Sequence, residues 1–291
     1  MNGSKVSLLK VDRLSADVIA LNKEQCIEAG SQFHNAYTTA TPFPHIVIDD
    51  FIDLEILRDI VAFWPATDDK RYYDRPQERL KYEWQPHELK SPLVRSFLNE
   101  MNSEPMVRFI EALTGIPLII ADPYFSGAGL HEVKRGGHLG VHADFNVHRG
   151  MNVLRRVNLL IYLNDDWLPE YGGNLELWSK DMSEMQREIA PKIGRAVVFN
   201  TELDSFHGHP EPLTCPANRS RRSIALYYYT ASKTAIESVP ARTTTFQVRP
   251  NSSDVPDFQT KLLHFAQDWI PPAIRRVLKQ KSKSAERQPP Q

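Results

Sequence analysis

The stretch Gly136-Gly-His-Leu-Gly-Val-His-Ala-Asp144 ends in two side chains that can bind a metal, His142 and Asp144. A third such side chain, His207, lies far downstream in the run Ser205-Phe-His-Gly-His-Pro210. Residues two apart on a strand point to the same side, so His142 and Asp144 can converge on one ion. Two imidazoles and one carboxylate can cover one face of an octahedral metal and leave three positions open, as in non-haem Fe(II) oxygenases. The three side chains therefore predict an iron site.

Other residues near these motifs leave alternatives open. Three more histidines lie close by in the sequence: His138, His148 and His209. We expect them on the surface or in contact with the metal ligands rather than with the metal. His209 is the main alternative to His207 as a ligand, because only one residue separates the two. We interpret His131 as structural. Cys215 has no second cysteine nearby, so we expect an ordinary loop thiol rather than a metal ligand.

Around these motifs the sequence consists of short apolar or alternating runs separated by glycine and proline. The runs are Leu118–Ala121, Gly129–Val133, Val157–Leu163, Leu175–Trp178, Ala196–Phe199 and Ser223–Tyr229. Short strands at such spacing predict a β-sandwich or barrel rather than alternating strand and helix units. All three metal-ligand candidates fall inside this region.

The segments before this region have helical patterns. Residues 43–64 begin with a β-rich run and continue with apolar residues at helical spacing after Asp53, a candidate N-cap. Residues 93–114 again show helical spacing, which is interrupted near Pro105. We expect a strand and several amphipathic helices that cover the sheet.

Two further segments complete the predicted organisation. Residues 70–90 are rich in charged and aromatic residues without a clear period, which is typical of a long ordered loop or lid. After residue 250 a helical pattern returns, breaks at Pro271-Pro272 and predicts a short helix through Leu278. The expected domains are an N-terminal arm at 1–40, a strand with helices and the lid loop at 41–117, a β domain at 118–232, a C-terminal helical extension at 233–278 and a frayed basic tail at 279–291.

Composition limits the classes of partner. The chain of 291 residues has 35 basic and 36 acidic residues, so its net charge of −1 favours neither nucleic acid nor an anionic membrane. The first residues lack the apolar core of a signal peptide, and no apolar stretch reaches the roughly 20 residues of a membrane span. The two cysteines, Cys26 and Cys215, suit free thiols in a reducing cytoplasm. We expect a cytoplasmic protein that acts on a small molecule or a peptide; its oligomeric state is not predicted.

A basic strand follows the distal histidine. In the run Ser220-Arg-Arg-Ser-Ile-Ala-Leu-Tyr227, strand parity places Arg221, Ser223, Ala225 and Tyr227 on one face. An arginine and a hydroxyl on that face can grip a carboxylate together, and an arginine inside a barrel needs an anion. Arg219 and Arg222 are alternatives to Arg221.

These motifs together resemble one known family. They are His142-x-Asp144, Tyr162-Leu-Asn-Asp-Asp-Trp167, Gly172-Gly-Asn-Leu-Glu-Leu177, His207 and Arg221-x-Ser223, with a weaker likeness at Thr41-Pro-Phe-Pro-His-Ile-Val-Ile-Asp-Asp-Phe51. The chain resembles the Fe(II)/2-oxoglutarate-dependent dioxygenase superfamily, and within it the prolyl 4-hydroxylase-like branch, over about residues 122–231. The resemblance implies a mainly β fold with flanking α-helices and a double-stranded β-helix core, the cupin-like jelly-roll, over 118–232.

The resemblance also implies roles for single residues. His142, Asp144 and His207 would bind Fe(II), while Arg221, helped by Ser223, would hold the distal carboxylate of 2-oxoglutarate. Tyr162 and Asn158 are further candidates to contact this cosubstrate. Besides Fe(II) and 2-oxoglutarate, the implied reaction uses O2, with ascorbate as a candidate accessory compound.

The expected activity is hydroxylation of an unactivated C–H bond, with succinate and CO2 as coproducts. Retention of Asp144 favours hydroxylation over halogenation, while desaturation, epoxidation and ring formation stay open. The expected substrate is a small molecule such as an amino acid or a natural-product intermediate, and the alternative substrate is a protein or peptide side chain. The alternatives of another class are a non-catalytic barrel that binds a metal or a partner and a cupin-like metalloenzyme. A prolyl substrate does not follow from the branch alone. Candidates to line a substrate cleft are the segment 70–90, the loop 145–156 with His148, Arg149, Arg155 and Arg156, and Trp167 or Trp178.

Overall fold

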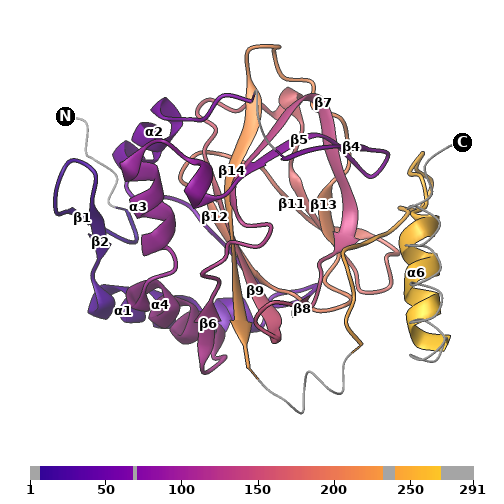
Figure 1. Cartoon of the computed structure of the whole chain (residues 1–291), viewed down its shortest axis with the longest axis horizontal. Coiled ribbons are helices and arrows are strands. Elements are labelled where there is room, and N and C mark those ends of the chain that lie inside the picture. The colour runs from indigo at the N-terminus through magenta and orange to yellow at the C-terminus, as the bar shows by residue number, and fades with distance from the viewer. Residues whose placement is uncertain (1–6, 68–70, 232–239, 270–291) are drawn as a thin grey trace, which may run out of the picture. The chain divides into compact units, whose positions relative to one another are not determined.

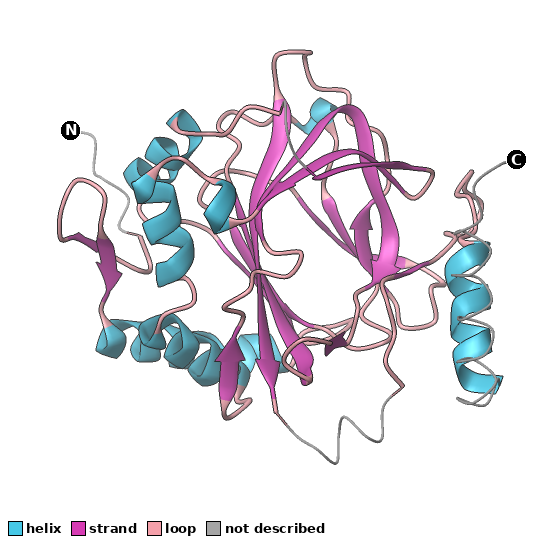
Figure 2. Cartoon of the chain, in the orientation of Figure 1, coloured by secondary structure: helices cyan, strands magenta, loops and turns pink. Residues whose placement is uncertain are grey.

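The computed structural model describes residues 7–67, 71–231 and 240–269, and Figures 1 and 2 show its course. The chain divides into two compact units, Met1–Val255 and Pro256–Gln291. Among its described residues the second unit contains helix α6 (Phe258–Trp269), where the helical pattern after residue 250 was expected. The short helix expected up to Leu278 and the tail expected at 279–291 lie outside the described residues.

An antiparallel sheet of 13 strands forms the centre of the first unit. Its main path has the strand order β11-β10-β13-β7-β14-β9-β12-β3. These strands are β3 (His45–Ile48), β7 (Gly129–Ala143), β9 (Val153–Tyr162), β10 (Leu175–Trp178), β11 (Met185–Ile189), β12 (Ala196–Asn200), β13 (His207–His209) and β14 (Ser220–Thr230). Branches from this path are β4 (Arg71–Arg75) and β5 (Glu78–Trp84), β6 (Ile119–Ala121), β8 (Val147–His148) and β15 (Thr245–Phe246). The expected mainly β fold with flanking helices is confirmed.

Strand β7 joins the two halves of this sheet. Its first part pairs with β14 and its last part with β13. The change of partner falls around Gly136 and Gly137, and Gly136 has a φ of +81°, which favours glycine. A Cβ at Gly137 would lie 2.6 Å from the carbonyl oxygen of Arg79 on β5. The two glycines thus allow one long strand to bend and serve both halves, with β5 running along its other edge.

Helices cover one side of the sheet, and Figure 1 shows α1 to α4 gathered there. They are α1 (Lys23–Thr38), α2 (Leu54–Ala62), α3 (Pro92–Glu100) and α4 (Glu104–Thr114), accompanied by the short strand pair β1 (Val11–Arg13) and β2 (Ile19–Leu21) and by a 3-10 turn at Pro86–Glu88. A second 3-10 turn, Pro169–Tyr171, packs through Tyr171 in a separate small cluster with Val133 and Trp167. Fully buried residues such as Phe97, Phe109 and Leu57 pack with sheet residues in one core. Each such side chain contributes about 1.5–3 kcal/mol by burial, so this layer fixes the outer face of the sheet.

Strand β14 shows how the layer positions the site. Ile224, Leu226 and Tyr228 belong to the core shared with the helices. Arg221, Ser223, Ala225 and Tyr227 alternate with them and line a cavity on the other side of the strand. The shared face predicted for these four residues is confirmed, and the cavity lies inside the sheet, away from the helices.

The segment 70–90 differs from the loop that its composition indicated. It forms a hairpin of β4 and β5, and β5 pairs with β7. The aromatic rings of Tyr72 and Tyr82 face each other across the hairpin at 4.9 Å between centroids. Alternation was hidden because charged side chains, among them Lys81 and Glu83, occupy the inward positions that apolar residues usually take.

Two smaller differences concern element ends. Asp53 stands at the N-cap position of α2, but its carboxylate makes no capping bond and instead accepts hydrogen bonds from Ser7 and from the backbone N–H of Val11. The strands β7, β9 and β14 extend beyond the apolar runs that predicted them, since polar residues continue each ladder.

No helix within the described ranges is both long enough and apolar enough to cross a membrane.

Candidate metal and cosubstrate site

Two neighbouring strands bring the predicted metal ligands together. His142 lies near the end of β7, and Asp144 follows directly after that strand ends at Ala143. His207 is the first residue of β13 and stands opposite His142 in the antiparallel register. Backbone pairing therefore places the two histidines side by side, although they are distant in sequence.

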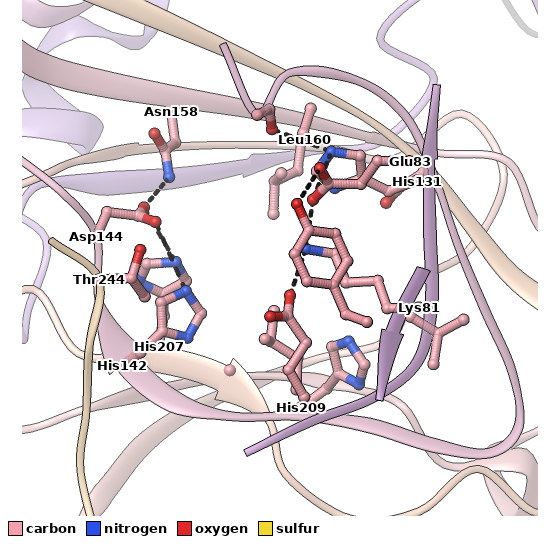
Figure 3. A pocket seen from close by; sticks show the side chains of 18 of the residues that line it. Lys81, Glu83, His131, His142, Asp144, Asn158, Leu160, His207, His209 and Thr244 are labelled. Atoms are coloured by element: carbon pink, nitrogen blue, oxygen red, sulfur yellow. Dashed lines mark hydrogen bonds and ion pairs between the residues drawn. The ribbon is translucent and has the colours of Figure 1, made fainter. Parts of the chain in front are cut away.

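The three side chains form a compact cluster. One candidate ligand atom from each residue lies within 4.8 Å of the other two. The Nε2 atom of His142 is 3.6 Å from Asp144 Oδ1, and the Nε2 atom of His207 is 3.5 Å from Asp144 Oδ2. Figure 3 shows the two imidazoles and the carboxylate turned toward one another. Two nitrogens and one carboxylate around a common point form a donor set that suits Fe(II).

Hydrogen bonds fix the orientation of both imidazoles. The Nδ1 atom of His142 lies 2.9 Å from the carbonyl oxygen of Gly140, and that of His207 lies 3.0 Å from the carbonyl oxygen of Ser205. Since carbonyl oxygens only accept, each Nδ1 carries the proton and each Nε2 keeps a lone pair toward the cluster. Burial lowers the pKa of His207 to about 4, so its ring is neutral at physiological pH, as a metal ligand requires.

An arginine and an asparagine hold the carboxylate of Asp144 in place. Its Oδ2 atom accepts hydrogen bonds from Arg155 Nη2 at 2.9 Å and from Asn158 Nδ2 at 2.8 Å. Burial opposes ionisation, but the Arg155 guanidinium outweighs it and holds the pKa of Asp144 well below its usual range. Arg155 also lies over the ring of Tyr227 at 3.4 Å. The carboxylate is thus ionised and fixed before any metal binds.

A second cationic side chain, Arg221, lines the same cavity without a carboxylate partner among the described residues. Its Nε donates to the carbonyl oxygen of Gly173 at 2.7 Å, and its Nη2 lies 3.3 Å from the hydroxyl of Tyr162. Burial lowers the pKa of Arg221, which indicates a site where the cation is poorly compensated. A guanidinium in such a place is suited to bind an anion.

The neighbouring arginines have other partners. Arg222 donates from Nε to Glu132 at 3.1 Å, and Arg219 donates to the backbone carbonyl of Asp165. Neither lines the cavity that contains the cluster. The structure therefore places Arg221, and not Arg219 or Arg222, inside the barrel.

The pattern of residues 128–229 matches the model of the 2OG-Fe(II) oxygenase superfamily. The chain carries a 2OG-Fe(II) oxygenase domain. The match contains the three clustered side chains and Arg221, whereas the β4–β5 hairpin and the segment of Thr244 and Phe246 complete the cavity from outside the matched residues. No relative among curated proteins matches the chain.

Solved structures share the fold of the oxygenase domain. A prolyl hydroxylase from Trichoplax adhaerens, in complex with a hypoxia inducible factor peptide fragment, has a TM-score of 0.50 at 17% identity over 74% of this chain and 96% of that one. A prolyl-4-hydroxylase from Pseudomonas putida has a TM-score of 0.48 at 18% identity over 70% and 100%. HygX from Streptomyces hygroscopicus, with nickel and 2-oxoglutarate bound, has a TM-score of 0.47 at 12% identity over 77% and 92%. The likeness at a TM-score of 0.50, together with the strand order of the antiparallel sheet, supports the double-stranded β-helix that the resemblance implied.

The cavity of the oxygenase domain has a volume of about 260 Å³. It is lined by the cluster, by Asn158, by Arg221 and Ser223, and by five polar side chains of the β4–β5 hairpin: Tyr73, Arg75, Glu78, Lys81 and Glu83. We name these five residues the hairpin wall. The segment 70–90 was expected to line a cleft, and these five residues of it do line the cavity. They do so from a strand pair and not from a loop, and the only sequence signal for that was the placement of Lys81 and Glu83 two apart, as on one face of a strand. Figure 3 shows Lys81 and Glu83 across the pocket from His142 and Asp144.

The remaining histidines are separate from the cluster. His209 lines the cavity, but its Nδ1 atom is buried without a hydrogen-bond partner and it does not belong to the three-residue group. His148 contacts Ser126 Oγ at 2.8 Å and accepts the backbone N–H of Met151, so it orders a loop. His138 contacts the carbonyl oxygen of Pro76 at 3.0 Å.

Other substrate-cleft candidates also have structural partners. Trp167 packs with Val133, and Trp178 packs with Val141, each in a small apolar cluster. Arg155 does line the cavity, but its guanidinium is bound to Asp144 and Asn158. Asn158, expected at the cosubstrate, uses its amide on these same two side chains.

Buried neutral histidines make the stability of the metal-free domain depend on pH. Burial lowers the pKa of His131 from 6.5 to about 4. The unfolded chain therefore takes up a proton below pH 6.5 that the folded domain takes up only near pH 4, and stability is lost as the pH falls through this window. We expect His131→Gln to remove up to about 3 kcal/mol of this acid-dependent loss. Urea unfolding of the metal-free protein at several pH values measures how stability depends on pH, and an equal dependence in both proteins would show that folding does not lower the pKa of His131.

Proposed function

We propose that this protein is a hydroxylase that uses Fe(II) and 2-oxoglutarate to oxidise an unactivated C–H bond of a small molecule. One observation carries the proposal: a single cavity contains both the His142, Asp144 and His207 cluster and the buried, uncompensated guanidinium of Arg221. A metal-binding barrel without an oxoacid would have no use for that cation. The family match to residues 128–229 supports the same assignment.

The cluster fits the metal that this reaction requires. His142 and His207 would bind Fe(II) through Nε2, because their Nδ1 atoms are used on backbone carbonyls. Asp144 would supply the carboxylate, which Arg155 and Asn158 hold in place through Oδ2. When bound, Fe(II) lets O2 react with 2-oxoglutarate and the substrate C–H bond, giving succinate, CO2 and the alcohol.

Side chains of strand β14 would bind the cosubstrate. Arg221 would bind the distal carboxylate of 2-oxoglutarate, with the hydroxyl of Ser223 on the same face of the strand. Tyr162 contacts the Arg221 guanidinium through its hydroxyl and through its ring, whose centroid lies 5.0 Å from Arg221 Cζ. It would therefore orient the arginine and reach the same carboxylate. The buried position excludes water and strengthens this ion pair.

The size of the cavity favours a small substrate. Its volume of about 260 Å³ is slightly below the roughly 300–1,000 Å³ of small-molecule sites, and it must hold 2-oxoglutarate as well. The β4–β5 hairpin and the strand β15 form part of its wall. A free small molecule fits such a space better than a segment of a folded protein.

The test is an anaerobic titration of the Fe(II)-loaded protein with 2-oxoglutarate. Chelation of the iron by the oxoacid is expected to produce a weak metal-to-ligand charge-transfer band in the visible range. Absence of the band when iron is bound would favour a cupin-like or non-catalytic barrel. In air, slow formation of succinate from 2-oxoglutarate is the matching activity.

The same titration shows whether His207 or His209 is the metal ligand. We expect His207→Ala to lose Fe(II) binding and the band, because one of three ligands is missing. His209→Ala is the matched control, since it truncates a buried histidine on the same strand that is not part of the cluster. Loss of iron in His209→Ala with retention in His207→Ala would reverse the assignment.

A further inference from the structure

The hairpin wall has no role in the metal or cosubstrate assignments above, yet it lines the same cavity. Lys81 Nζ donates to Glu78 Oε1 at 2.8 Å and to Glu83 Oε1 at 2.7 Å. Arg75 Nη2 donates to Glu78 Oε2 at 3.0 Å, and Tyr73 donates to Glu83 Oε2 at 3.1 Å. Two cations and two carboxylates are therefore fixed on one strand pair beside the candidate metal centre.

The charges of Glu78, Lys81 and Glu83 persist in the folded protein. Burial opposes ionisation of Glu83, but the Lys81 ammonium outweighs it and lowers the pKa of Glu83 to about 2. The pKa of Glu78 is lowered by the same neighbour against the same effect of burial. Burial also opposes the charge of Lys81, but the two carboxylates outweigh it and raise the Lys81 pKa. A ligand at this wall therefore meets ionised groups of both signs.

The wall has hydrogen-bonding capacity left over. Each of its four carboxylate oxygens accepts one hydrogen bond from within the wall, whereas a carboxylate oxygen can accept two. Lys81 directs two of its three N–H groups at the glutamates, and Arg75 uses one of its five on Glu78. Both acceptors and donors are thus available to a ligand from the cavity side.

Stability does not explain why these charges are here. A buried ion pair is often no more stabilising than apolar residues of the same size, because desolvation offsets the attraction. Charged side chains at the wall of a cavity are instead suited to recognise a ligand with matching charges. A ligand with a net charge would leave one group of this balanced set unpaired, which is costly in a buried site.

Arg75 connects the wall to the metal side of the cavity. Its guanidinium carbon lies 5.0 Å from the ring centroid of Phe246, and that ring lies 5.3 Å from the ring of His142. The Arg75 side chain is 46% exposed, so it stands at the rim and can receive an incoming carboxylate. Glu78 and Glu83 are buried and lie farther in.

We propose that the hairpin wall is the substrate subsite and that it binds a small zwitterion, a free amino acid, with the carboxylate on Arg75 and the ammonium group on Glu78 and Glu83. The inference rests on the proposed function, because it assigns the substrate of that same site. It also separates a free amino acid from a residue within a peptide, whose α-amino and α-carboxyl groups carry no charge.

The experiment uses the full-length protein with Fe(II) and 2-oxoglutarate under anaerobic conditions. Each common free L-amino acid is added singly, and its N-acetyl amide serves as the uncharged counterpart. We expect at least one free amino acid to shift the charge-transfer band and, in air, to accelerate succinate formation, while its N-acetyl amide does neither. If no free amino acid does so, or if the capped form binds equally well, the inference is wrong. A missing band before any amino acid is added would refute the proposed function itself.

Two matched variants locate the subsite. Arg75→Gln is expected to weaken binding of the active amino acid at least about tenfold, because a charge-assisted hydrogen bond is lost. Arg79→Gln is the control, since Arg79 lies on the same hairpin, is 51% exposed and pairs with Asp74 outside the cavity. The band formed with 2-oxoglutarate alone is recorded first in each variant, and the affinity for the amino acid is then compared at saturating 2-oxoglutarate. Equal amino-acid affinity in Arg75→Gln and Arg79→Gln would overturn the assignment of Arg75.

Discussion

Asp144→Asn is expected to lower Fe(II) affinity more than about 100-fold and to abolish succinate formation. Loss of residues that merely support a metal ligand typically costs 10–100-fold, and Asp144 is the candidate ligand itself. The amide cannot provide the negative charge that partly neutralises the ion. Fe(II) binding measured under anaerobic conditions, together with succinate formation at saturating iron, would show both effects.

The variant also leaves Arg155 without its carboxylate. Removing one partner of a buried ion pair costs about 3–5 kcal/mol, so Asp144→Asn is expected to lose stability as well as metal. The double variant Asp144→Asn with Arg155→Met separates the two effects, because it should recover stability without recovering iron. Asp165→Asn is a control at a carboxylate that is 45% exposed and pairs with Arg58. Full iron affinity in Asp144→Asn would exclude Asp144 as a ligand.

The local part of the site was predictable from sequence. The spacing of His142 and Asp144 needs only the geometry of one strand end, and the alternation along β14 separates Arg221 and Ser223 from Arg222. The side-by-side position of His142 and His207 is different, because it results from pairing between β7 and β13. Spacing alone does not specify such a pairing, and the resemblance to a known family supplied it.

The parts that were missed depend on partners distant in sequence. Lys81 and Glu83 face inward because they neutralise each other and have β7 beside them, so the usual rule of apolar inward positions failed for β5. Arg155 was expected to line a substrate cleft and does line the cavity, but its bond to Asp144, made from strand β9, was not predicted. In both cases a charged residue is buried because a partner of opposite charge lies next to it in the fold. The sequence shows that such a residue is charged, but it does not show which oppositely charged residue lies beside it in the fold.

Arg221→Met is expected to raise the dissociation constant for 2-oxoglutarate by about 30-fold to several thousand-fold, with Fe(II) affinity unchanged. Truncating one partner of a buried charge pair costs about 2–5 kcal/mol, and every 1.4 kcal/mol is a factor of ten. Arg219→Met and Arg222→Met are the matched controls, since both side chains bond elsewhere and should leave 2-oxoglutarate affinity intact. Arg222→Met should instead lower stability, because Glu132 is fully buried and loses one of its cationic partners. Titration of the charge-transfer band in the three variants decides among the arginines: an unchanged affinity in Arg221→Met would show that the cavity cation does not hold the cosubstrate.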